Sequence, residues 1–104
     1  MRGEVVTVLF PFSNLAVAKR RPALVLIDLP GKDVVLAAIT STGTDPNAIT
    51  LQRKDFASGR LLRPSFILPA KLFTIERTLV EKSIGKISEE KRLEVIQKLT
   101  ELLK

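Results

Sequence analysis

Short apolar runs separated by turn residues make up most of the chain before its last helix. Three clear runs lie at residues 5–9, 23–27 and 34–39, and all are rich in Val, Leu and Ile. Runs of this length and composition are typical of buried strands. Pro22 precedes the second run, and we expect it to be the first residue of that strand, where no ladder N–H is required.

The second and third runs flank a turn signal, the Pro-Gly pair at residues 30–31. Antiparallel pairing about this turn places Arg21 opposite Thr40, so that a guanidinium and a hydroxyl meet at the open end of the hairpin. The same register places Asp28 opposite Asp33. Because like charges opposite each other are unfavourable, a longer loop is the alternative.

The middle of the chain predicts shorter elements. Turn residues at 41–47 indicate a loop, residues 48–52 a short strand, and residues 53–60 a polar, basic turn. Beyond them, apolar pieces interrupted by Pro64 and Pro69 are typical of bent or edge strands. These pieces are residues 61–62, 65–68 and 71–75. Residues 84–87 add a last short strand.

The C-terminal residues carry the one clear helical pattern. Ser88 is a good N-cap, and Glu89 and Glu90 follow where the helix dipole favours anions. An apolar stripe then recurs at helical spacing, at Val95, Ile96, Leu99, Leu102 and Leu103. Short strands followed by one helix suggest a mainly β fold, a small bent barrel in a single domain spanning residues 1–104.

Composition narrows the chemistry. The 104 residues include no Cys and no His, which excludes disulfides, thiolate metal sites and any Ser-His or Cys-His arrangement. No apolar window has the length of a membrane span, and residues 1–9 lack a signal-peptide cleavage site, so we expect a cytoplasmic protein. The net charge of +6 points to an anionic partner, either nucleic acid or an acidic protein segment.

The remaining candidate chemistry is a cationic cluster at the end of the hairpin. Arg20, Arg21, Thr40 and Ser41 would form it, with the basic residues Arg53, Lys54, Arg60 and Arg63 expected nearby. A guanidinium beside a hydroxyl suits phosphate, because its planar donors match two phosphate oxygens. In RNA cleavage by the internal 2′-hydroxyl, the nucleophile belongs to the substrate, and preorganised donors stabilise the transition state. Such chemistry requires neither a metal nor another cofactor.

Several separated motifs resemble the PemK/MazF-like toxins of type II toxin–antitoxin systems. They are PFS at 11–13, KRRPALVL at 19–26, LAAITS at 36–41, DFASG at 55–59, LLRPSF at 61–66 and KLFT at 71–74. The resemblance implies an SH3-like barrel of the PemK/MazF/CcdB-like type with a C-terminal α-helix, in a homodimer. It also implies metal-independent, sequence-selective cleavage of single-stranded RNA to 2′,3′-cyclic phosphate and 5′-hydroxyl ends, neutralised by a cognate antitoxin with an acidic disordered segment.

The resemblance assigns roles by position. Arg21 and Thr40 match the family's shared catalytic positions, the same pair that the hairpin brings together; Lys19, Arg20, Ser41 and Arg63 are the expected RNA-binding residues. The family's Arg-Pro-Asp is replaced here by LPA at 68–70, so an arginine and an acid/base carboxylate are missing. The general base is therefore open, with Asp55 and Glu4 as weak candidates.

Two alternatives stand beside an RNA-cleaving toxin. One is a non-catalytic SH3-like module that binds nucleic acid or an acidic peptide, which the missing Arg and Asp leave open. The other is the same fold acting on a protein target, since a fold does not determine a function. Phe10 and Phe12 have a similar ambiguity, because they would either stack on exposed bases or close one end of the core.

Overall fold

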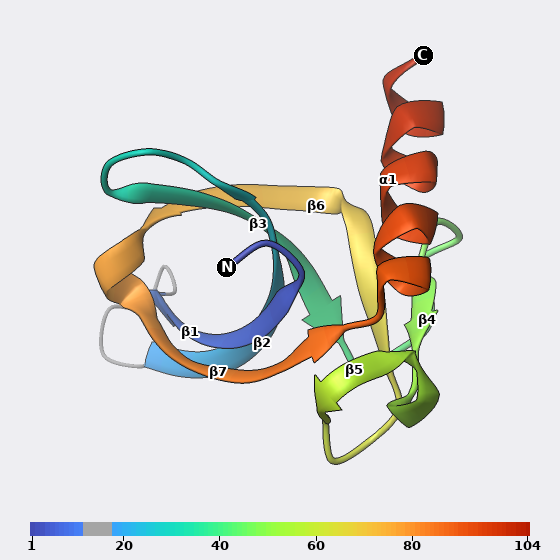
Figure 1. The fold of residues 1–104 in the computed structure, drawn as a ribbon, viewed down its shortest axis with the longest axis horizontal. Coiled ribbons are helices and arrows are strands. Elements are labelled where there is room, and N and C mark those ends of the chain that lie inside the picture. The colour runs from blue at the N-terminus through green and yellow to red at the C-terminus, as the bar shows by residue number, and fades with distance from the viewer. Residues whose placement is uncertain (12–17) are drawn as a thin grey trace.

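The computed structural model describes residues 1–11 and 18–104. They form a single antiparallel sheet of seven strands in the order β4-β6-β3-β2-β1-β7-β5, followed by one helix. The strands are β1 (Glu4–Pro11), β2 (Ala18–Asp28), β3 (Asp33–Thr40), β4 (Ile49–Leu51), β5 (Phe56–Gly59), β6 (Ser65–Glu76) and β7 (Val80–Ile87). Short 3₁₀ turns η1 (Arg53–Asp55) and η2 (Arg77–Leu79) precede β5 and β7, and the helix is α1 (Glu89–Leu103). The sheet curls strongly on itself, and α1 stands to one side, next to β4 and β6 (Figure 1).

The curled sheet buries apolar side chains on both faces. Val5 and Leu24 belong to a cluster that includes Val95 of α1, whereas their chain neighbours Val6 and Ala23 belong to a second cluster. Because successive strand residues point to opposite faces, both clusters draw on the same strands. This double burial explains why the runs predicted as strands lack polar alternation. The mainly β barrel with a terminal helix is confirmed.

The central hairpin keeps the expected register near its open end. Ala23 pairs with Ala38 and Val25 with Leu36, as the predicted turn requires. A bulge after Val25 then shifts the ladder by one residue, so that Asp28 faces Val34 instead of Asp33. The unfavourable carboxylate pair does not form, and the alternative of a longer loop is confirmed.

Pro22 is not the first residue of its strand, contrary to expectation. β2 begins at Ala18, and Pro22 lies inside it, opposite Thr7 of β1. The β2–β3 ladder ends at Ala23, so Arg21 does not pair with Thr40 as predicted; its partner is Val8 of β1. Residues 18–22 pair with β1 instead, a long-range partner that the local pattern does not reveal. A proline cannot donate to a ladder, which agrees with the ladder ending beside it.

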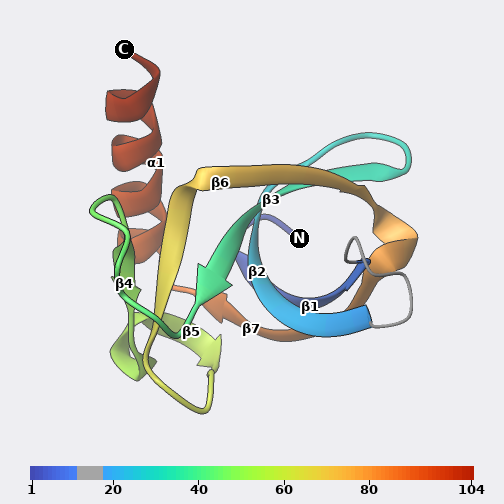
Figure 2. The same cartoon turned by 180° about the vertical axis from the view of Figure 1, so that it is seen from behind.

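β6 is one bent strand rather than several apolar pieces. Ala37 pairs with Leu72 and Ala38 with Leu68, so the three residues from Pro69 to Lys71 are left out of the ladder. This bulge produces the corner of β6 that is visible in Figure 2. The bend was predicted, but β6 is not an edge strand, because it lies between β4 and β3. β7 likewise begins at Val80, before the predicted start, because its first residues pair with β1.

Helix α1 begins as predicted, with the Ser88 hydroxyl accepting the Lys91 backbone N–H at 3.1 Å. Its apolar stripe is only partly covered. Val95 is buried and Leu99 half-buried, but Ile96 is 42% and Leu103 is 84% exposed. The helix therefore presents an apolar surface that the described part of the chain does not cover. No helix in residues 1–11 and 18–104 is long and apolar enough to cross a membrane.

Candidate functional site

A groove of about 910 Å³ lies at the open end of the central hairpin. It is lined by β1, β2, β3 and β7 and by the segment that precedes β6. The groove brings together most of the site residues expected from the sequence, namely Arg20, Arg21, Thr40, Ser41 and Arg63. Lys19 is placed only by its backbone, opposite Phe10 in the β1–β2 ladder. The side chain of Phe10, and Phe12 altogether, fall outside the described residues.

Pairing with β1 positions the two arginines of β2. Arg21 lies opposite Val8 and Arg20 opposite Leu9, and both arginines are exposed. Arg20 Nε donates a hydrogen bond to Glu81 Oε1 at 2.8 Å. Glu81 occupies a bulge of β7, where the ladder to β1 slips by one residue. Bulges re-aim side chains, and this one sets a carboxylate beside the groove.

The hydroxyl of Thr40 is held by the turn that follows β3. Thr40 Oγ1 accepts the backbone N–H of Thr42 at 3.2 Å and lies 3.2 Å from the Thr42 hydroxyl. Such a local bond fixes the orientation of the hydroxyl. The loop then passes directly over Phe66, since a Cβ on Gly43 would lie 2.5 Å from the Phe66 ring. A side chain at this position would require the Phe66 ring to move.

The segment of residues 60–63 forms the opposite wall. Gly59 immediately precedes this segment and has a positive φ of 69°. A Cβ at Gly59 would meet the Ile84 carbonyl oxygen at 2.2 Å, so a glycine is required at this turn. The side chains of Arg60 and Arg63 have no ion-pair or hydrogen-bond partner in the described part of the chain, and Leu62 between them is 94% exposed. The segment thus carries unneutralised charge and bare apolar surface on a fixed turn.

Thr7, Lys82 and Ser83 also line the groove, and the sequence reasoning did not single them out. Thr7 was detectable in principle, because it is the one polar residue in the run at 5–9. Lys82 and Ser83 were not, because they fall in the part of β7 that was missed.

Other candidates lie elsewhere. Arg53 and Lys54 do not line the groove. Asp55 is buried beneath α1, where its carboxylate lies 3.7 Å from Lys91 Nζ and accepts the Gln52 backbone N–H at 2.7 Å. Glu4 lies opposite Lys86 in the β1–β7 ladder and does not line the groove either. Neither carboxylate is placed to act on a ligand in the groove.

The groove is therefore cationic and rich in hydroxyls. None of the described residues that line it is a carboxylate, and Glu81 adjoins it through the bond to Arg20. Among the residues described, no three of the usual acid, His or Cys ligands gather into a metal site. Guanidinium and hydroxyl donors are the groups that suit a phosphodiester.

Comparison with known proteins places this geometry in a family. The chain matches, over residues 1–103, the family described as PemK-like, MazF-like toxin of type II toxin-antitoxin system. No curated protein sequence matches the chain significantly.

Solved structures share the fold along almost all of the chain. A mycobacterial endoribonuclease in complex with its cognate antitoxin has a TM-score of 0.78 at 16% identity, covering 99% of this chain and 93% of its own. A chain of a MazE–MazF structure from Deinococcus radiodurans has a TM-score of 0.77 at 24% identity, covering 98% of this chain and 94% of its own. The Mycobacterium tuberculosis toxin MazF-mt6 has a TM-score of 0.75 at 15% identity, covering 96% and 95%. At these identities the likeness shows a shared fold.

Proposed function

Because the chain belongs to the PemK-like, MazF-like toxins of type II toxin–antitoxin systems, we propose that it is an endoribonuclease that cleaves single-stranded RNA. The observation that carries the proposal is the groove, which gathers Arg20, Arg21, Thr40, Ser41 and Arg63 from separate parts of the chain. Structural neighbours that are themselves endoribonucleases support the reaction class.

In this proposal the catalytic pair is Arg21 and Thr40. Arg21 stabilises the charge that develops on the pentacoordinate phosphorus and donates to the departing 5′-oxygen. Thr40 positions the scissile phosphate with the hydroxyl that its turn already orients. Arg20, Ser41 and Arg63, together with Lys19, bind the RNA backbone. One preorganised donor of this kind contributes about 3 kcal/mol to transition-state stabilisation.

The nucleophile is the substrate's own 2′-hydroxyl. Its oxygen bonds to phosphorus while the bond to the 5′-oxygen breaks, which leaves a 2′,3′-cyclic phosphate and a 5′-hydroxyl. The proton of the 2′-hydroxyl passes to a base, and the departing oxygen takes up a proton. Because the attacking group comes from the RNA, no step in this scheme requires a metal ion.

The test is cleavage of a labelled RNA in the presence of a chelator. We expect undiminished cleavage, and no cleavage of an otherwise identical RNA with a single 2′-deoxy substitution at the cut site. Product ends identified by mass spectrometry should carry the cyclic phosphate. Binding without cleavage in any condition would contradict the proposal and favour a non-catalytic RNA-binding module.

We also propose a protein partner, a cognate antitoxin whose acidic segment covers the groove. The support is the net charge of +6 and the concentration of arginines at one surface, together with neighbours that are themselves bound to antitoxins. An acidic segment and RNA would then compete, and the competition should weaken as salt rises. Simultaneous binding of both with no loss of RNA affinity would contradict this assignment.

A further inference from the structure

A second cavity lies beside the groove, on the other side of the segment of residues 60–63. It has a volume of about 260 Å³ and is enclosed by η1, the start of β5 and that segment. Arg60, Leu61, Leu62 and Arg63 line both spaces. The segment is thus a shared wall, and a strand of RNA that leaves the groove over it meets the second cavity next.

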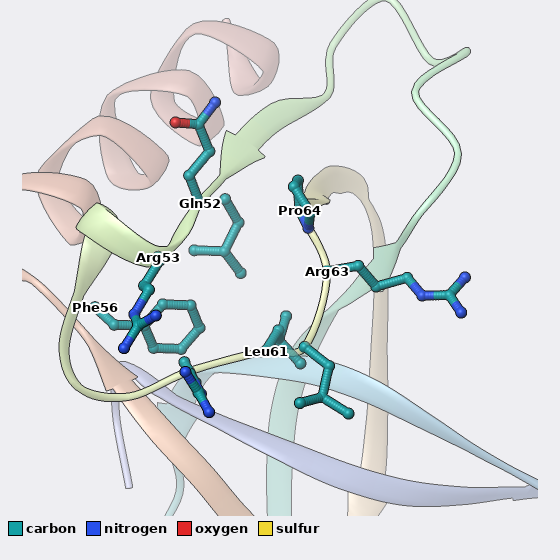
Figure 3. Close-up of a pocket in the computed structure, with 9 residues that line it drawn as sticks. Gln52, Arg53, Phe56, Leu61, Arg63 and Pro64 are labelled. Carbon is teal, nitrogen blue, oxygen red and sulfur yellow. The ribbon is translucent and has the colours of Figure 1, made fainter.

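The lining of this cavity combines an aromatic ring with cations. Figure 3 shows Phe56 and Leu61 facing the interior, and Arg53 also lines the cavity. Arg63, in contrast, points away from the cavity. The side chains of Arg53 and Arg60 have no ion-pair or hydrogen-bond partner among the described residues, whereas Arg20, Arg77 and Arg92 are each paired with a carboxylate.

We propose that this cavity binds the base of a nucleotide that flanks the scissile linkage, as a second subsite of the RNA whose cleavage is proposed above. Phe56 and Leu61 contact the planar base. Arg53 and Arg60 bind the adjoining phosphate. Leu62, exposed on the shared wall, separates this base from its neighbour in the groove and keeps the two unstacked.

The lining favours a nucleotide over an acidic peptide. A carboxylate side chain requires only the cations, whereas an aromatic face beside an aliphatic wall matches the flat surface of a base. A guanidinium adds both a planar partner for the base and a bidentate partner for its phosphate.

The first experiment compares two neighbouring cations. Arg53→Gln removes a charge from the cavity, and Lys54→Gln removes the same charge from the next residue, which lines neither the cavity nor the groove. Binding is measured by fluorescence anisotropy with two uncleavable RNAs, one short enough to fill only the groove and one extended on both sides. We expect Arg53→Gln to weaken the long RNA roughly tenfold and to leave the short RNA unchanged, because one charge-assisted phosphate contact is lost. Lys54→Gln should change both RNAs only slightly and equally.

The second experiment locates the base. Abasic sites are placed singly along the long RNA, and parent protein is compared with Phe56→Leu, which keeps an apolar side chain but removes the ring. The parent should lose roughly fivefold or more in affinity at one flanking position. Phe56→Leu should lose much less at that same position, since the base and the ring are coupled. Thermal melting of the variant checks that it is folded. The abasic scan is repeated with Arg53→Gln, whose side chain is exposed, so that its removal does not disturb the core.

These binding measurements are independent of turnover. If the parent binds RNA but never cleaves it, the reaction proposed above fails while the subsite stands. Equal affinities of Arg53→Gln and Lys54→Gln for the long RNA overturn the subsite, as does an abasic scan without coupling to Phe56. If Arg53→Gln weakens only a poly-glutamate probe, the cavity belongs to an acidic protein partner, and the proposal is wrong.

Discussion

Arg20 and Glu81 form an ion pair across β1, with 2.8 Å between Arg20 Nε and Glu81 Oε1. They are 61 positions apart in the chain, and their strands, β2 and β7, lie on either side of β1 in the sheet. The pair occupies the edge of the groove and neutralises one of its cations. Since the arginine side chain is 70% exposed, the pair is accessible to a competing phosphate.

Glu81→Gln should therefore strengthen RNA binding. Removal of the carboxylate releases Arg20 for a backbone phosphate, so the slope of log affinity against log salt should steepen by about 0.7 for single-stranded RNA. Anisotropy titrations over a range of salt concentrations measure both effects. The double variant with Arg20→Gln is the control, and in it the gain should disappear. Unchanged affinity and slope would show that Arg20 makes no phosphate contact, and a large fall in kcat would identify Glu81 as the missing general base.

Arg21→Ala and Thr40→Val test the proposed catalytic pair. Arg21→Ala should reduce kcat by at least a hundredfold, because a donor to the transition state is lost. Thr40→Val keeps the shape and removes only the hydroxyl, so it should lower kcat more than it raises KM. Single-turnover cleavage of one labelled RNA measures both, and thermal melting confirms the fold. If both variants cleave as fast as the parent, catalysis resides elsewhere.

Local patterns predicted the elements of this fold better than their pairing. The runs at 5–9, 23–27 and 34–39 became strands because double burial demands continuous apolar stretches, and Ser88 capped α1 because its hydroxyl satisfies a free N–H. The placement of Pro22 and the start of β7 were wrong for one reason, since both depend on pairing with β1, far away in the sequence.

The site shows the same division. That Arg21 and Thr40 line one groove could be expected from the hairpin, because one short turn brings their strands together, although the β2–β3 ladder ends before it reaches them. The bond between Arg20 and Glu81 could not be predicted, because it joins strands that only the closed sheet brings together. The second cavity could not be predicted either, because Phe56, which lines it, lies on β5, and β5 pairs with β7, far away in the sequence.

Asp28 should make stability depend on pH. Its carboxylate accepts a hydrogen bond from Arg77 Nη1 at 2.5 Å, and this guanidinium holds the pKa of Asp28 below its ordinary value of 3.8. A lowered folded-state pKa stabilises the fold fully above the unfolded-state pKa, and the effect is lost as the pH falls through the folded-state value. Asp28→Asn should therefore lower the melting temperature at neutral pH, and the difference from the parent should vanish in the acidic range below 3.8.

The control for Asp28 is Glu76→Gln. Glu76 lies 3.8 Å from Lys32 in a pair whose side chains are 56% and 81% exposed, so it should contribute little at any pH. Melting curves from neutral to strongly acidic pH compare the two variants. A difference between parent and Asp28→Asn that persists below the acidic transition would show that the ionic contact with Arg77 is not its cause.

Asp55→Ala tests the view that this carboxylate is structural. The substitution leaves the buried Lys91 ammonium with Glu94 alone and removes the acceptor of the Gln52 N–H, so unfolding should become easier by about 3 kcal/mol. Denaturant unfolding measures the loss. Glu94→Gln removes the other, more exposed partner of Lys91 and should cost less than about 1 kcal/mol. Cleavage per folded molecule should match the parent in both variants, and a selective loss in Asp55→Ala would restore Asp55 as a general-base candidate.

The exposed part of the apolar stripe of α1 is a candidate interface for the expected homodimer. Ile96 and Leu103 recur at helical spacing and remain exposed, next to the half-buried Leu99. Exposed apolar side chains in one line on a helix gain free energy when a partner removes them from water, and in a homo-oligomer a two-fold axis lets the same surface serve both subunits. We therefore expect sedimentation of a dimer at micromolar concentration.

Ile96→Glu tests whether this stripe forms the interface. A buried carboxylate without a partner is costly, so the variant should sediment as a monomer while its melting temperature falls only modestly, because Ile96 is 42% exposed in the single chain. Leu62→Glu is the matched control, since Leu62 is 94% exposed but lies on the groove wall, far in sequence from α1. It should remain dimeric and should weaken RNA binding instead. A monomeric parent would exclude the dimer, and a dimeric Ile96→Glu would move the interface away from the helix to another apolar surface.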